Sequence, residues 1–179
     1  MDLGDKLAVL QSRWQEMKTA VRTQPAAQGF ATHSQWIEDI LAYIEYFSDQ
    51  SNLTLDPELA SFYMMQLASF TLPRAIEFSA RLRGELAGAV ASGDISPDAM
   101  RQLLASKPIT MDKLSEALQS ATKANANVGG VLAPHLATLT RESQQFDRLA
   151  QEVLDTGRSS LDSLTLFGRG TQLVDAGYT

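Results

Sequence analysis

Apolar residues recur at helical spacing along the first third of the chain. The first stripe, with alternating steps of four and three, consists of Leu3, Leu7, Leu10, Trp14, Met17 and Val21. A second stripe keeps this period in a different phase and consists of His33, Ile37, Ile40, Ile44 and Phe47. Both patterns predict amphipathic helices that pack lengthwise against neighbours. Because Pro25 and Gly29 lie between the stripes, we expect the first helical arm to be broken there.

The middle of the chain predicts its longest helix, over residues 57–90. Turn-forming residues dominate positions 48–55 and predict a reversal. Asp56-Pro57-Glu58 then suits a helix start, since aspartate caps helices and proline fits their first turn. Pro73 lies inside this helix, and its missing N–H predicts a kink near residues 69–72.

Further reversals are predicted at residues 90–94 and 125–130, and Pro134 is expected to begin the last long helix, whose apolar line extends to Leu164. The resulting prediction is an all-α protein, an antiparallel up-down four-helix bundle with long helices, its first arm broken near Pro25–Gly29 and with a kink near Pro73. We expect one helical-bundle domain over residues 1–168. Residues 169–179 lose the pattern and are expected to form a frayed tail.

Charge and cysteine content exclude several classes of protein. The net charge is −6, so a basic face that could neutralise nucleic-acid phosphates is not expected. The chain has no cysteine, which removes disulfides, thiolate chemistry and Cys-zinc sites. Neither a long apolar run nor the basic start of a signal peptide occurs. Two alternatives remain: a soluble cytosolic protein, or a segment that lies between membrane spans in a longer chain.

The sequence offers no constellation of catalytic or metal-binding residues. His33 and His135 are the only histidines, and neither has a carboxylate or second histidine at a ligand spacing. We expect His33 on a partly buried helix face and His135 at the surface. Nucleophile elbows and glycine-rich phosphate loops are absent from the sequence. The sequence therefore predicts no enzyme, no cofactor and no metal.

Two arginines of the long helix are candidates for ligand binding. Arg74 and Arg81 are two turns apart on one face, a separation of about 10 Å at 1.5 Å per residue. Such a face turned inward needs a carboxylate or an anionic ligand to match the guanidinium groups. Glu77 is placed to neutralise both arginines within the helix. Tyr63, Arg74 and Arg81 are accordingly the predicted site for a small polar or anionic molecule, with ordinary surface arginines as the alternative.

One ordered string of residues in this region resembles a known family. His33, Ile40 and Ile44 are followed by Asp49-x-Ser51-Asn52-Leu53-x-Leu55-Asp56-Pro57-x-Leu59-x-Ser61-x-Tyr63-x-Met65, then by Leu72-Pro73 and Leu82-Arg83-Gly84. The string resembles the helical extracytoplasmic sensor region of bacterial transmembrane receptors. These are chiefly methyl-accepting chemotaxis proteins, with related histidine kinases and diguanylate cyclases.

The resemblance implies the sensor domain of an inner-membrane receptor. Such a domain lies in the periplasm and is attached to the membrane only through segments absent from this chain. It also implies binding of a small molecule or partner, transmission of a helix rearrangement, and a homodimer in the full receptor. The first and last helices are the expected dimer face. A soluble helical scaffold that dimerises through its apolar stripes is the alternative.

Overall fold

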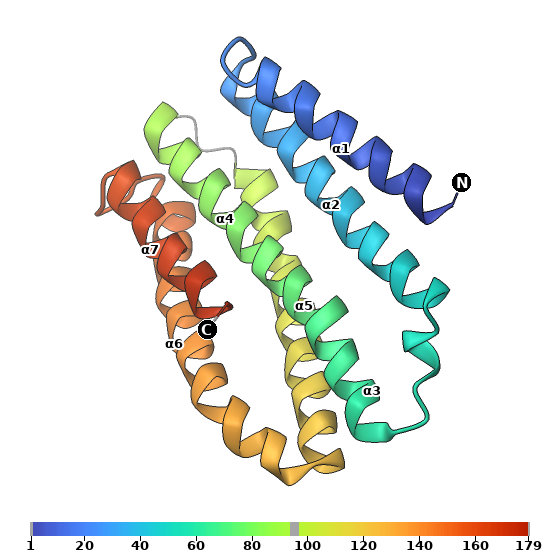
Figure 1. Ribbon diagram of the computed structural model, residues 1–179. Helices are drawn as coiled ribbons and strands as arrows, with labels where there is room; N and C mark the ends of the chain where they lie inside the picture. Colours follow the sequence, from blue (N-terminus) through green and yellow to red (C-terminus); the bar gives the residue numbers. More distant parts are fainter. Residues whose placement is uncertain (1, 94–96, 179) are drawn as a thin grey trace. The chain divides into compact units, whose positions relative to one another are not determined.

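The computed structural model describes residues 2–93 and 97–178, and all of the secondary structure in those ranges is helical (Figure 1). This confirms the predicted all-α class. Contacts group the chain into two compact units, residues 1–70 and residues 71–179. The first unit contains α1 (Leu3–Ala20), α2 (Ala26–Gln50), a 3₁₀ turn (Leu53–Leu55) and α3 (Leu59–Gln66). The second contains α4 (Leu72–Ser92), α5 (Pro97–Ala124), α6 (Ala126–Thr156) and α7 (Ser163–Ala176).

Helices α1 and α2 form an antiparallel hairpin. The Trp36 indole N–H donates to the Leu10 carbonyl at 3.0 Å, and Arg13 pairs with Asp39. The Trp14 and Trp36 rings stack with centroids 4.8 Å apart. The predicted break is present, because α1 ends at Ala20 and α2 begins directly after Pro25. The two helices fold back on each other, however, so the prediction of a single broken arm is wrong.

The predicted reversal after α2 is present as a tight, irregular connection, but it begins later than predicted, because α2 continues to Gln50. Asn52 adopts a left-handed conformation with φ of 60°, which asparagine tolerates better than most residues. Asp56 accepts a hydrogen bond from the Glu58 backbone N–H at 2.9 Å. Helix α3 begins at Leu59, two positions later than predicted, because Asp56 forms this local turn instead of capping at Pro57.

A π-helical turn, Leu67–Thr71, connects α3 to α4. It lies directly before Leu72-Pro73, where the sequence predicts a kink. A proline cannot donate to the carbonyl one turn earlier and its ring crowds that carbonyl, so the preceding turn widens. The regular α-helix is therefore interrupted at the predicted place, and the division between the two units falls in this turn.

In the second unit each helix contacts the next, and α7 also contacts α4. Helix α5 continues through positions 107 and 108 and ends at Ala124. Asn125 alone makes the reversal, and its side chain caps α6 by accepting from the Asn127 N–H at 3.0 Å. The prediction of a loop over residues 125–130 is therefore too long. Pro134 lies inside α6, so the prediction that it begins the last helix is wrong.

The last predicted arm divides into two helices. Gly157 ends α6 with φ of 65°, a conformation that glycine adopts without steric cost. Asp162 then caps α7 by accepting from the N–H groups of Leu164 and Thr165. Leu164 is 80% exposed, so it does not continue the apolar line of α6.

Helix α7 packs antiparallel to α4 in a regular register (Figure 1). Gly170 lies against Arg83, and Gly177 lies against Ile76. The buried apolar side chains of α7 are Leu166, Leu173 and Val174. The prediction of a frayed tail over residues 169–179 is therefore wrong up to Ala176. Gly170 occupies one of the buried positions of α7, and this hides a periodic pattern that depends on large apolar side chains.

Candidate functional site

The three predicted site residues come from both units. Tyr63 lies in α3, and its ring meets the Phe62 ring edge to face with centroids 5.5 Å apart. Arg74 and Arg81 lie in α4. Arg74 is exposed and Arg81 is partly buried. A ligand site that combines Tyr63 with the two arginines stays a prediction.

Within α4, Arg81 forms a partly buried ion pair with Glu77. The Arg81 Nε donates to Glu77 Oε1 at 3.0 Å, across one turn of the helix. The Glu77 side chain is only 10% exposed and that of Arg81 is 30% exposed. A carboxylate this deep in a protein needs a matching charge, since an isolated one is strongly disfavoured. Glu77 thus neutralises Arg81 internally, as the sequence suggests.

The burial of Glu77 follows from the position of α4 within the second unit. Helix α4 contacts α5 and also α7, so two sides of the helix are covered. The buried residues of α4 are Ala75, Ile76, Glu77, Ser79, Leu82, Leu86 and Ala87. An anionic ligand at Arg81 would have to share this guanidinium with Glu77 or displace it.

Arg83 lies in α4 two positions after Arg81, and its side chain contacts α7. Its Nη1 donates to Thr171 Oγ1 at 3.0 Å, and its guanidinium carbon lies 4.3 Å from the centroid of the Phe167 ring. Its aliphatic stem lies over Gly170. The buried Nε has no hydrogen-bond partner among the described residues. Sequence reasoning missed this contact because all three α7 residues fall in or beside the expected tail.

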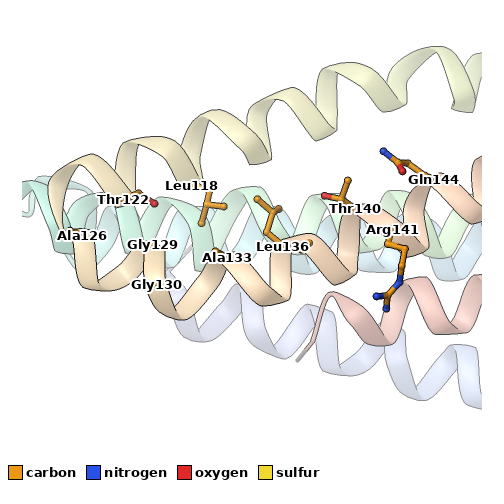
Figure 2. Close-up of a pocket in the computed structure, with 11 residues that line it drawn as sticks. Leu118, Thr122, Ala126, Gly129, Gly130, Ala133, Leu136, Thr140, Arg141 and Gln144 are labelled. Carbon is orange, nitrogen blue, oxygen red and sulfur yellow. The ribbon is translucent and has the colours of Figure 1, made fainter.

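A groove of about 630 Å³ runs between α5 and α6. Figure 2 shows Leu118 of α5 and Leu136 of α6 along it, with Thr122 and Ala126 near the end where the helices join. Gly129 makes the close approach there, because a Cβ at that position would lie 2.5 Å from the Thr122 Cγ2. The lining is dominated by glycine, alanine and leucine. The groove can therefore accept apolar groups, and few of its lining side chains can form hydrogen bonds or ion pairs.

The histidines take no part in a metal or catalytic constellation. His33 is partly buried and meets the Trp14 ring edge to face at 5.9 Å, while His135 is exposed; both positions were predicted. The described ranges contain no group of three or more histidine, aspartate or glutamate side chains placed to hold a metal ion.

Comparison of the chain with protein-family models, with curated proteins and with solved structures finds no match. Of the helices that the structure describes, none combines the length and the apolar character needed to cross a lipid bilayer.

Proposed function

We propose that this chain is the extracytoplasmic, periplasmic sensor domain of a bacterial transmembrane chemoreceptor or a related signalling protein. The observation that carries the proposal is the ordered segment from Asp49 to Gly84, which resembles that receptor class. Its residues form the end of α2, the Asp56 turn, α3, the π-helical turn and most of α4. The motif therefore covers the whole of α3 and the π-helical turn, with parts of α2 and α4, and it extends from the first compact unit into the second.

The packing of α4 supports a role in transmission. A helix is stiff along its axis, so a displacement at one end is carried to the other. Helix α4 contacts both α5 and α7. Within α4, the partly buried Glu77–Arg81 ion pair stabilises the helix, because moving the two charges apart at this site costs free energy. A ligand or partner that shifts α4 would thus shift its neighbours as well.

An antiparallel up-down four-helix bundle also belongs to this proposal, now for residues 71–179 alone and not for the predicted residues 1–168 with a broken first arm. In residues 71–179 the contacts run from α4 to α5, from α5 to α6, from α6 to α7 and back from α7 to α4. This closed order of neighbours is the one expected when four helices surround a shared core. We also propose that the full receptor is a homodimer. A nucleic-acid partner has no support, because the net charge of the chain is −6.

The reading frame that encodes this chain tests the proposal at little cost. A receptor sensor requires apolar membrane spans on both sides of residues 1–179 and a signalling domain beyond the second span. A frame without these flanking segments would refute the proposal.

A chimaera provides a functional test: residues 1–179 replace the sensor of a chemoreceptor whose kinase output is measurable. Matched chimaeras with Arg81→Ala and Arg158→Ala then ask whether the α4 ion pair matters for output. We expect only the first to change it.

A second candidate is a soluble helical scaffold that dimerises through apolar surface. Large apolar side chains around the connection from α2 to α3 favour it, because Leu55 is 72%, Leu59 is 58% and Phe47 is 46% exposed. Sedimentation equilibrium of the isolated chain, compared with a Leu55→Ser/Leu59→Ser variant, separates the two proposals. The scaffold requires a stable dimer that this variant abolishes.

A further inference from the structure

A second cleft lies within residues 71–179, away from the α4 ion pair. It has a volume of about 340 Å³ and is formed by α6, by the connection at residues 160–161, and by α7. Its apolar lining consists of Phe146, which is only 1% exposed, together with Leu149 and Leu161. The volume is at the lower end of the range for small-molecule sites. A compact organic ligand therefore fits, whereas a drug-sized one does not.

Two arginines from different helices line this cleft. Arg148 comes from α6 and Arg169 comes from α7, and both are exposed. Arg169 Nη1 donates to the neutral Gln172 Oε1 at 3.2 Å. Within the described ranges no carboxylate pairs with either arginine. The lining also contains Glu142, which already accepts from the guanidinium group of Arg141 at 3.1 Å. The lining thus carries two positive charges and one negative charge, in a chain whose net charge is −6.

The wall opposite α6 is held in place by hydrogen bonds. Glu152 accepts from the Ser160 backbone N–H at 2.7 Å and from its hydroxyl at 3.1 Å. Asp162 accepts from the Thr165 backbone N–H at 2.9 Å and from its hydroxyl at 2.6 Å, which fixes the start of α7. These hydrogen bonds fix the position of the wall, so little ordering free energy is lost when a ligand binds.

We propose that this cleft binds a small aliphatic dicarboxylate. A guanidinium group recognises a carboxylate through two parallel hydrogen bonds, and the arginines of α6 and α7 provide one such group for each end of the ligand. The short carbon chain between the carboxylates lies over Leu149 and Leu161. Gln145 and Gln172 supply amide groups at the edge of the cleft. A ligand that bridges Arg148 and Arg169 also cross-links α6 to α7.

The inference deepens the proposed sensor function by naming a ligand class, and it rests on that function only for its biological role. Binding itself is a property of residues 71–179 and is measured on the isolated chain. A failure of binding would overturn the cleft proposal without affecting the receptor proposal, which depends on the flanking membrane spans. Missing spans would overturn the receptor proposal and leave the cleft intact.

The experiment is isothermal titration calorimetry of the full chain with succinate. We expect one saturable site with a Kd at or below about 1 mM. Arg148→Gln and Arg169→Gln should each weaken binding by about 10- to 100-fold, since each removes a charge-assisted hydrogen-bond pair. Arg148→Lys and Arg169→Lys keep the charge but lose the planar fork, and are also expected to weaken binding. Arg158→Gln is the matched control, because Arg158 is exposed in the same connection and does not line the cleft.

Two further titrations define what is recognised. Succinamide has the same carbon chain without charge, and inorganic phosphate has charge without the carbon chain; neither should bind measurably. The proposal is overturned by an absence of saturable succinate binding, by an equal loss in Arg158→Gln, or by phosphate binding as tightly as succinate. Equal binding of succinamide would overturn it as well. Circular dichroism of each variant confirms that the exposed substitutions leave the helices intact.

Discussion

A Cβ atom at Gly170 would lie 2.6 Å from the Cγ of Arg83, which is closer than side-chain carbons approach. It would also lie 3.0 Å from the Phe146 Cζ. Glycine at this position thus lets α7 pack against both α4 and α6. Arg83 completes the contact by reaching across Gly170 to Thr171 and to the face of the Phe167 ring.

Gly170→Ala is expected to destabilise the protein. The added methyl group overpacks a close contact, at a cost that exceeds the gain of about 1 kcal/mol from the higher helix propensity of alanine. We expect a net loss of about 1 kcal/mol, or a drop of about 2–4 °C in Tm for a chain of this size. Thermal denaturation followed by circular dichroism measures it.

Gly168→Ala is the matched control in the same helix. Nothing lies within 4 Å of a Cβ at Gly168, so only the propensity gain applies and Tm should rise. The opposite signs of the two variants are the decisive result. If both variants raise Tm, α7 does not pack on Arg83 as described.

Arg81→Met should cost about 1–3 kcal/mol of unfolding free energy, because it removes the guanidinium group that pairs with the buried Glu77 carboxylate. The partial exposure of Arg81 keeps the expected loss below that of a fully buried pair. The double variant Glu77→Leu/Arg81→Met should recover most of the stability, since it removes both charges. Urea denaturation of the single and double variants measures the coupling. Strictly additive losses would show that the pair has no role in stability.

The stacked rings of Trp14 and Trp36 should produce an exciton couplet in circular dichroism. Either Trp14→Phe or Trp36→Phe should abolish the couplet. Trp36→Phe should in addition lose about 1 kcal/mol, because the indole donor to the Leu10 carbonyl disappears. An intact couplet in either variant would contradict the α1–α2 register.

Stability should fall in acid partly through Asp162. Hydrogen bonds from the Thr165 hydroxyl and then from the Thr165 backbone N–H lower the pKa of this carboxyl from its usual 3.8. The folded pKa lies below the unfolded one, so the stabilisation is present above the unfolded value and is lost as pH falls through the folded value.

Asp162→Asn keeps a capping oxygen but does not titrate, so its Tm should fall less than that of the wild type between about pH 5 and about pH 3. Asp175→Asn provides a control at an exposed position of the same helix. An acid dependence of Asp162→Asn equal to that of the wild type would rule out the carboxyl as a contributor.

The helical class and the interruption before Pro73 could be predicted from the sequence because both depend on local effects. Apolar period and proline geometry act within a few residues, and neither needs knowledge of distant contacts. The Glu77–Arg81 pair could be anticipated for the same reason, since residues four apart on a helix are neighbours.

The remaining features depend on residues that are far apart in the chain. The α1–α2 hairpin is specified by contacts such as the one between Trp36 and Leu10, which no helical stripe reveals. Helix α7 was missed because Gly170 contributes to packing by having no side chain. The cleft with Arg148 and Arg169 was missed because its walls come from two helices whose register the sequence does not encode locally.

The contact between α4 and α7 also constrains how the chain is made. Arg83 and Thr171 are 88 positions apart in the chain. The buried residues of α4 include Leu82 and Leu86, which are synthesised long before α7. At about 5–20 residues per second, the ribosome needs several seconds to cover that distance. The apolar face of α4 therefore remains incompletely covered during translation, at the stage when a nascent chain is most open to aggregation or chaperone binding.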